Sequence, residues 1–224
     1  MDRNKLAQCI DHTLLKAATS GQQVEAVCRE ALAWQFASVC VPPSFVAAAA
    51  HLLKNSPVQV GTVIGFPLGY NLPEVKRVEA QRAQQDGARE VDMAMQVGRF
   101  KSGDFSFVER ELRHVVEATP GLVHKIIIEC SLLTNREKAD AVRLVIDSGA
   151  EFVKTGTGFG PKGTTLEDVN LLVRWADGKI AVKAAGGISD PVTAVAMVEA
   201  GARRIGTSSA VQIIEAFGSR SYES

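Results

Sequence analysis

The sequence predicts a single-domain (β/α)8 barrel, an α/β fold of the TIM-barrel class in which eight parallel strands alternate with helices. Short apolar runs alternate with longer amphipathic segments along almost the whole chain. The length of 224 residues lies in the lower part of the range for this fold. Glycine–alanine pairs recur after three predicted helices, which indicates a repeated joint between helix and strand. An open, doubly wound sheet has the same alternation and is the structural alternative.

The strands are expected where short apolar or β-branched runs end in polar or glycine-rich turns. They are residues 8–13, 37–41, 58–64, 89–95, 124–129, 151–155, 179–184 and 203–207. Helices are expected at 22–34, 43–53, 72–85, 105–118, 136–147, 166–175, 191–199 and about 210–217. This assignment gives one barrel domain at residues 1–217 and a polar C-terminal tail at 218–224. We expect the tail to be mobile, with Tyr222 able to fold over the barrel mouth.

The three repeated joints predict a common register for the strands that follow them. The joints are Gly87-Ala88, Gly149-Ala150 and Gly201-Ala202. Five residues after each glycine come Asp92, Lys154 and Gly206, respectively. The equal offset from an equivalent joint predicts similar heights for these residues on their strands.

Alternation along the strands separates polar from apolar residues, because successive side chains point to opposite faces. Polar residues and Cys40 share one face, and Val, Ile and Met occupy the other. The inward set predicted in this way is Ser38, Cys40, Asp92, Lys125, Glu129, Lys154 and Lys183. The outer face of a barrel packs on helices, so we expect the polar set to line the lumen near its mouth.

The composition excludes several classes of partner. Lys plus Arg and Asp plus Glu are equal at 25 each, and no basic tract occurs, which argues against nucleic-acid binding. No apolar run is long enough for a membrane span, and the polar N-terminus lacks a signal-peptide core. Four cysteines without a Cys-x-x-Cys pair indicate free thiols in the cytoplasm. The four histidines form no ligand-spaced cluster, so no metal site is expected.

Two inward lysines on consecutive strands predict an amine with altered chemistry. Neighbouring strands lie about 4.8 Å apart, so the ammonium groups of Lys154 and Lys183 should nearly meet. Like charges in a poorly solvated pocket lower at least one pKa, and a neutral amine can attack a carbonyl to form a Schiff base. Asp92 could then shuttle protons, and Asp11 could pair with one lysine. The residues alone do not decide which lysine is the nucleophile, and purely structural lysine–carboxylate pairs are the alternative.

Glycine and hydroxyl residues follow the last three predicted strands, where a phosphate cradle is common in barrels of this class. Simple turn glycines are the alternative for any one of these stretches. Together with Asp11 and Cys40 in the lumen, they form the set that we expect to bind substrate. This set is Asp11, Cys40, Thr155, Gly158, Gly186, Gly187, Gly206, Ser208 and Ser209.

Several ordered motifs make the chain resemble the deoxyribose-phosphate aldolase family. They include Ile10-Asp-His-Thr-Leu-Leu-Lys16, Val63-Ile-Gly-Phe-Pro-Leu-Gly69, Phe152-Val-Lys-Thr155, Val182-Lys-Ala-Ala-Gly-Gly-Ile188 and Arg204-Ile-Gly-Thr-Ser-Ser209. The resemblance implies cofactor-free cleavage of 2-deoxy-D-ribose 5-phosphate to D-glyceraldehyde 3-phosphate and acetaldehyde, in deoxyribonucleoside breakdown. It also implies that Lys154 forms the Schiff base and that Asp92 and Lys183 relay protons. Phosphorylated aldehydes and sugars would be the partners, and apolar outer faces would permit a homodimer.

The chain departs from the family pattern beside its predicted catalytic residues. Glycine stands at 156, where the family usually has serine, and glutamine stands at 96, where it usually has asparagine. We still expect an active enzyme, with altered rate or substrate preference. Two other functions stay open: a different phosphate-binding barrel enzyme, such as an isomerase with Asp92 as base, and a non-catalytic sugar-phosphate sensor.

Overall fold

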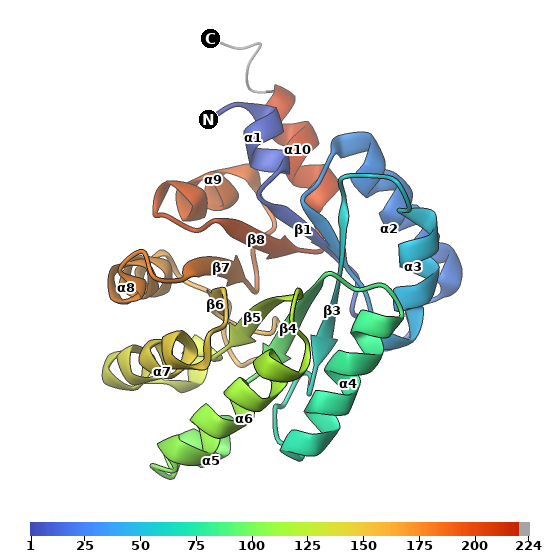
Figure 1. The fold of residues 1–224 in the computed structure, drawn as a ribbon. Coiled ribbons are helices and arrows are strands. Elements are labelled where there is room, and N and C mark those ends of the chain that lie inside the picture. The colour runs from blue at the N-terminus through green and yellow to red at the C-terminus, as the bar shows by residue number, and fades with distance from the viewer. Residues whose placement is uncertain (220–224) are drawn as a thin grey trace.

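The computed structural model describes residues 1–219 and forms a closed barrel of parallel strands surrounded by helices (Figure 1). The strands follow one another around the barrel in chain order, and β8 pairs with β1. They are β1 (Ile10–Thr13), β2 (Ser38–Cys40), β3 (Gln59–Ile64), β4 (Glu90–Ala94), β5 (Val123–Ile127), β6 (Phe152–Lys154), β7 (Ala181–Ala185) and β8 (Arg204–Thr207). The predicted fold class is confirmed, and closure excludes the open sheet. Tyr222 lies outside the described residues.

The helices cover the outer face of the barrel (Figure 1). They are α1 (Arg3–Ala7), α2 (Gly21–Trp34), η1 (Pro43–Phe45), α3 (Val46–Leu52), α4 (Pro73–Gln85), α5 (Val97–Lys101), α6 (Phe105–Ala118), η2 (Cys130–Leu132), α7 (Asn135–Ser148), α8 (Leu166–Ala176), α9 (Pro191–Glu199) and α10 (Ala210–Ser219). All predicted helices are present. The sequence interpretation did not predict α1, α5 or η2, and α10 extends beyond its predicted end to Ser219.

Side-chain caps fix where α7 and α8 begin. Thr134 accepts a hydrogen bond from the Glu137 amide, and the Glu137 carboxylate accepts one from the Thr134 amide. Thr165 and Asp168 form the same capping box at the start of α8. Each box satisfies amides that would otherwise lack partners in the first helical turn. The β6–α8 connection therefore ends at a defined point.

Within the strands the predicted alternation is confirmed, because the outward residues pack against the helices. Glu129 is the exception in the predicted inward set: β5 ends at Ile127, and a left-handed backbone at Glu129 turns its side chain towards the loop after β6. This buried outer layer includes Val39, Val91, Met93, Ile126, Val153, Val182 and Ile205. The register pairs Lys154 with Lys183 across β6 and β7, and Asp92 with Lys125 across β4 and β5. Paired residues on neighbouring strands point to the same face, so these charged side chains share the lumen.

Outside the lumen, a buried ion pair joins α4 to α6. The Lys76 ammonium lies 2.9 Å from a carboxylate oxygen of Glu111 and donates a 2.9 Å hydrogen bond to the Ala94 carbonyl. Both charged side chains are fully buried. Burial lowers the pKa of Lys76 and raises the pKa of Glu111, and each charge partly offsets the shift of the other. The pair is therefore held by mutual compensation.

Replacing Glu111 with alanine should lower the free energy of unfolding by about 3–5 kcal/mol, because Lys76 would remain buried without its countercharge. Urea unfolding followed by circular dichroism measures the loss. The matched control is Glu109→Ala on the same helix, which breaks an exposed pair with Arg113 and should cost about 0.5 kcal/mol or less. Equal losses in the two variants would contradict the importance of the buried pair. A Lys76→Met, Glu111→Leu double variant should recover much of the stability.

Candidate active site

The lower lumen contains a network of charged side chains contributed by four strands. Arg204 from β8 donates to both Asp11 on β1 and Glu90 on β4. The Lys125 ammonium, from β5, lies 2.5 Å from Glu90, 3.5 Å from Asp11 and 3.4 Å from Asp92. Asp11, Glu90 and Lys125 are almost inaccessible to solvent. Each charge in this layer is thus compensated by a neighbour, as burial requires.

Above this layer, two lysines meet at one carboxylate. The ammonium of Lys183 lies 2.5 Å from Oδ2 of Asp11 and 2.6 Å from Oδ2 of Asp92. The amine of Lys154 lies 2.7 Å from the same Asp92 oxygen. The structure therefore brings together the three residues predicted to carry the chemistry. It also places Asp11 against one of the two lysines, as the sequence interpretation expected.

The two lysines differ in their surroundings, and this difference separates their pKa values. Burial alone would lower the pKa of Lys183, but the flanking carboxylates of Asp11 and Asp92 outweigh it and raise that pKa well above its usual range. Burial also lowers the pKa of Lys154, whose single carboxylate partner only partly offsets it, and the charge of Lys183 lowers it further. The geometry favours Lys154 as the neutral amine, a choice that the sequence left open.

The numbers of cations and anions in the network also favour a neutral Lys154. Burial would raise the pKa of Asp92 and of Asp11, but the surrounding cations outweigh it and lower both values, so the two carboxylates stay ionised. If every group were charged, the cations Lys125, Lys154, Lys183 and Arg204 would face only the anions Asp11, Glu90 and Asp92. Loss of one proton from Lys154 balances the network. The composition of this buried cluster therefore favours the neutral form of Lys154.

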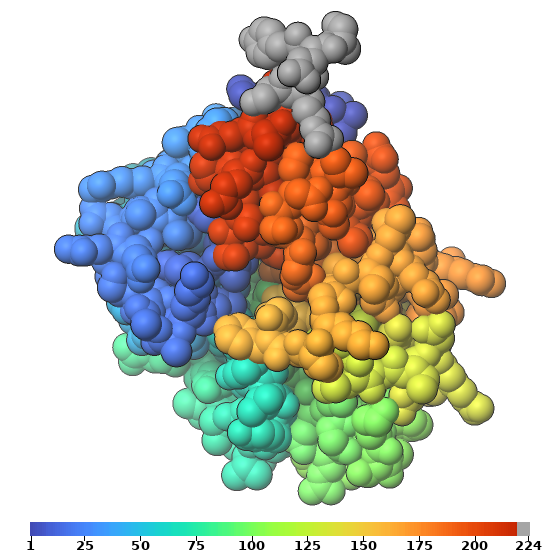
Figure 2. Space-filling view, turned by 180° about the vertical axis from the view of Figure 1, so that it is seen from behind, coloured from blue at the N-terminus to red at the C-terminus, as the bar shows by residue number. Residues whose placement is uncertain are grey.

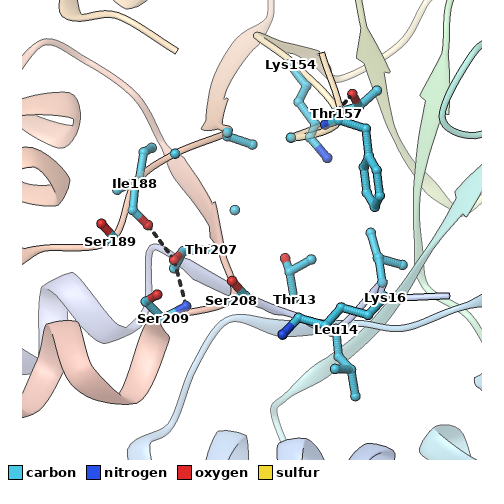
Figure 3. Close-up of a pocket in the computed structure, with 17 residues that line it drawn as sticks. Thr13, Leu14, Lys16, Lys154, Thr157, Ile188, Ser189, Thr207, Ser208 and Ser209 are labelled. Atoms are coloured by element: carbon cyan, nitrogen blue, oxygen red, sulfur yellow. Dashed lines mark hydrogen bonds between the residues drawn. The ribbon is translucent and has the colours of Figure 1, made fainter. Parts of the chain in front are cut away.

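A cavity of about 340 Å³ opens above Lys154, between the loops that follow β6, β7, β8 and β1 (Figure 3). Six of the predicted binding residues line it: Gly158, Gly186, Gly187, Gly206, Ser208 and Ser209. In Figure 3, Lys154 and Thr157 lie on one side of the cavity, and Ser189, Thr207, Ser208 and Ser209 lie on the opposite side. A ligand could thus contact the amine and the hydroxyl-rich loops at the same time.

The hydroxyl-rich side has the features of an anion cradle. The Thr207 hydroxyl donates to the Ile188 carbonyl at 2.6 Å and accepts from the Ser209 amide at 2.9 Å, which fixes the turn into α10. Gly186 and Gly187 both have positive φ angles, of 105° and 78°. A Cβ atom at Gly186 would lie 3.6 Å from Cα of Gly158, so the two loops pack backbone against backbone. Bare amides and a helix N-terminus favour a phosphate here.

The structure places the other predicted binding residues outside the cavity lining. The Thr155 hydroxyl bridges β6 to β7 by bonding both the amide and the carbonyl of Ala185, at 3.0 Å each. Asp11 lies in the charged layer below Lys183. Cys40 is buried in the lumen, where burial, aided by the charge of Asp92, raises the pKa of its thiol to about 11. These three residues therefore belong to the framework around Lys154 and Lys183 and not to the cavity lining.

Gly206 combines a structural role with its place in the lining. A Cβ atom there would lie 3.0 Å from Cε of Lys183 and 3.0 Å from Cβ of Ala185. Real Cβ atoms rarely make contacts that close, so a larger residue would push against the Lys183 side chain. The glycine leaves the space through which Lys183 reaches Asp11 and Asp92.

Sequence reasoning missed Lys16, which lines the cavity from the loop after β1. Lys16 is a single cation in a loop, and nothing in its local pattern distinguishes it from a solvated surface lysine. The signal is topological: closing the barrel pairs β1 with β8, which brings the loop after β1 beside the cradle. Thr13, Leu14, Phe159 and Ser189 also line the cavity and were not predicted.

The described residues form neither a metal-ligand cluster nor a membrane-spanning helix. Within residues 1–219, no group of three or more His, Cys, Asp or Glu side chains is placed to hold a metal ion. None of the helices in the same range combines the length and the apolar character that crossing a bilayer needs.

Comparison with known proteins gives consistent matches along the chain. Residues 5–215 match the model of the DeoC/LacD family of aldolases. The deoxyribose-phosphate aldolase of Exiguobacterium sibiricum is 52% identical over 210 residues, which cover 93% of this chain and 95% of that protein. A solved structure named QR15, an aldolase, has a TM-score of 0.93 and 43% identity, covering 97% of this chain and 98% of that one. The deoxyribose phosphate aldolase from Aeropyrum pernix, described as tetrameric, has a TM-score of 0.91 and 35% identity, covering 98% and 93% of the two chains.

Proposed function

Because the chain belongs to the DeoC/LacD family of aldolases, we propose that it reversibly cleaves 2-deoxy-D-ribose 5-phosphate to D-glyceraldehyde 3-phosphate and acetaldehyde through a Schiff base on Lys154. The protein is thus a carbon–carbon lyase. The observation that carries the proposal is the unequal pairing of the two lysines, with one carboxylate at Lys154 and two at Lys183. Of these two lysines, Lys154 lines the cavity that a substrate can enter and Lys183 does not.

The cradle and the amine define how the substrate would lie. Its phosphate would occupy the end of the cavity near Gly187, Ser208 and the start of α10, where amides and hydroxyls can donate hydrogen bonds. Lys16 adds a cation to the same cavity. The aldehyde carbon of the open-chain sugar would then meet Lys154. Because both ends of the substrate are held, the amine attacks an aldehyde that is already oriented, and the step becomes effectively unimolecular.

The chemical steps follow from a neutral Lys154. Its amine attacks the aldehyde carbon C1, and loss of water leaves a protonated Schiff base beside Asp92. The C3 hydroxyl gives up its proton and the C2–C3 bond breaks, with the electron pair moving into the Schiff base to form an enamine. D-glyceraldehyde 3-phosphate leaves, the enamine carbon takes up a proton, and water releases acetaldehyde and the free amine. The Schiff base acts as the electron sink throughout.

Asp92 and Lys183 are placed to handle the protons. Asp92 contacts both lysines through one oxygen, and Lys183 remains an ammonium because two carboxylates hold its proton. In this proposal, the pair delivers and removes protons at the hydroxyl and at the enamine carbon, directly or through water. The carboxylate of Asp92 also stabilises the positive charge that forms on the Schiff-base nitrogen.

Incubation with 2-deoxy-D-ribose 5-phosphate tests the proposed reaction. Acetaldehyde should accumulate in step with D-glyceraldehyde 3-phosphate, each followed by its own coupled dehydrogenase. Excess chelator should leave the rate unchanged, since the proposed steps need no metal. Thermal stabilisation by the sugar phosphate without turnover would instead favour a sensor. Conversion to another sugar phosphate without acetaldehyde would favour an isomerase.

A substitution in the cradle should affect phosphorylated substrates selectively. Ser208→Asp places a negative charge at an exposed position of the cradle and should raise KM for 2-deoxy-D-ribose 5-phosphate about tenfold or more, through like-charge repulsion. Cleavage of unphosphorylated 2-deoxy-D-ribose provides the internal control and should change less than about twofold, a fraction of a kcal/mol. An equal loss with both sugars would place the phosphate elsewhere.

We further propose that the chain forms a homodimer and acts in the cytoplasm. The tetrameric description of the Aeropyrum pernix relative supports self-association within the family. Four free cysteines, Cys9, Cys28, Cys40 and Cys130, favour a reducing compartment. Sedimentation equilibrium tests the assembly, and a single monomeric species at micromolar concentration would exclude the dimer.

A further inference from the structure

Glu129 makes a set of contacts that the proposed reaction steps do not use. It follows β5 in a left-handed backbone conformation, with φ 54° and ψ 69°, which is rare for a residue other than glycine. Its side chain turns towards the loop after β6. One carboxylate oxygen accepts from the Thr157 amide at 3.0 Å and from the Thr157 hydroxyl at 2.6 Å. The other accepts from the Ser131 hydroxyl at 3.1 Å.

Two glycines make room for this carboxylate. A Cβ atom at Gly156 would lie 2.8 Å from Oε1 of Glu129, and one at Gly160 would lie 2.5 Å from the same oxygen. The β6–α8 loop thus wraps around the Glu129 side chain on both sides of Thr157. This packing gives a physical reason for glycine at 156, where the family resemblance leads one to expect serine. In this chain, the space that a serine side chain would take is filled by Glu129.

Thr157 connects Glu129 to Phe159 and, through it, to the loop after β3. Its hydroxyl accepts a 3.0 Å hydrogen bond from the Phe159 amide. The Phe159 ring meets the edge of Phe66, from the loop after β3, with ring centroids 5.4 Å apart. In Figure 2, the yellow-orange segment after β6 lies across the middle of the face that is shown, beside the teal segment after β3. The carboxylate of Glu129 therefore anchors a strip of chain that spans the barrel mouth.

This strip separates two cavities. On one side lies the 340 Å³ cavity that contains Lys154, and on the other lies a cavity of about 160 Å³. Thr157 and Phe159 line both of them. Glu129 also lines the smaller cavity, and its other walls are mainly apolar: Pro67, Leu68, Ala94, Met95, Ile127 and Leu132. Its lining would suit an aliphatic chain better than a phosphate or a hydroxylated sugar.

We propose that Glu129 is a positioning residue that holds Thr157 as the wall between the two cavities, and that this wall limits Lys154 to short aldehydes. The inference rests on the proposed Schiff-base function of Lys154. With the wall in place, the carbon chain of a longer aldehyde bound to Lys154 has no access to the apolar cavity. Without it, the two cavities join, and the aliphatic chain gains an apolar environment.

Borohydride trapping of the Schiff base, with acetaldehyde and pentanal as alternative probes, tests this inference. Glu129→Ala should raise the ratio of pentanal to acetaldehyde trapping about tenfold or more. That is the size of effect expected when part of an aliphatic chain gains an apolar pocket. Thr157→Val removes the hydroxyl that bonds both Glu129 and the Phe159 amide but keeps the bond from the Thr157 amide to Glu129, so it should shift the ratio in the same direction by less. Glu129→Gln retains an acceptor oxygen for Thr157 and should restore most of the wild-type ratio.

Ser131→Ala is the matched control, because it removes a hydrogen bond to Glu129 without touching Thr157 or either cavity. Its trapping ratio should equal that of the wild type. An unchanged ratio in folded Glu129→Ala, or in Thr157→Val if the alanine variant does not fold, would overturn the inference. Failure of the wild-type protein to trap acetaldehyde would instead overturn the proposed function, so the two failures are distinguishable.

Discussion

Lys154→Ala should lower kcat for cleavage of 2-deoxy-D-ribose 5-phosphate by about 10⁴-fold or more, because loss of a covalent nucleophile removes the reaction path itself. The fold should survive, since the variant removes the one amine whose protonation would unbalance the lumen network and leaves Asp92 paired with Lys183 and Lys125. Steady-state turnover and circular dichroism measure the two effects. Binding of the substrate should persist, because the phosphate cradle is untouched.

Two controls separate this result from a general effect of losing a lysine. Lys154→Arg retains a positive charge but cannot supply a neutral amine, so it should be as inactive as the alanine variant. Lys179→Ala removes an exposed lysine outside the site and should leave kcat unchanged. Substantial activity in the arginine variant would rule out a Schiff base at this position.

Asp92→Asn should reduce kcat by about 10²- to 10⁴-fold, the usual contribution of a positioned proton-transfer group. It should also change the pH dependence. The carboxylate of Asp92 favours the charged form of Lys154, so removing it lowers the pKa of Lys154 further below the usual value of about 10.4. A larger fraction of the amine is then neutral at low pH. The midpoint of acetaldehyde trapping should therefore move to lower pH even as turnover falls.

Asp11→Asn is the matched comparison for this prediction. Asp11 pairs with Lys183 and Lys125 but makes no ion pair with Lys154, so its loss should leave the trapping midpoint nearly in place. Trapping rates from pH 5 to pH 10 on both variants measure the difference. A midpoint in Asp92→Asn at or above that of the wild type would contradict the electrostatic account of Lys154.

The larger elements of the fold could be predicted because each carries its own periodic pattern. The 14-residue helix α6 has a strongly amphipathic sequence, and its ends agree with the prediction. Helices α1 and α5 have five residues each, and η2 has three, so none spans enough turns to show a period. Asp2 caps α1 by accepting from the Lys5 amide, but such a short capping signal resembles an ordinary turn.

The part of the candidate site that lies on the strands could be predicted, because side chains alternate between the two faces of a strand. Alternation placed Asp92, Lys154 and Lys183 in one lumen, because inward residues of adjacent strands must meet there. It did not distinguish the two lysines, since their difference depends on Asp11, which comes from the far end of the chain. The role of Glu129 was also out of reach. Its side chain leaves the strand pattern where the backbone turns left-handed, and no local signal in the sequence marks that turn.

Borohydride trapping with acetaldehyde, followed by peptide mapping, tests the central claim most directly. We predict one ethyl adduct, confined to the peptide that contains Lys154 and absent from Lys154→Ala. An adduct on Lys183 would contradict the assignment of the nucleophile, because two carboxylates should keep that lysine protonated. Folded protein that forms no adduct would contradict the Schiff-base mechanism altogether.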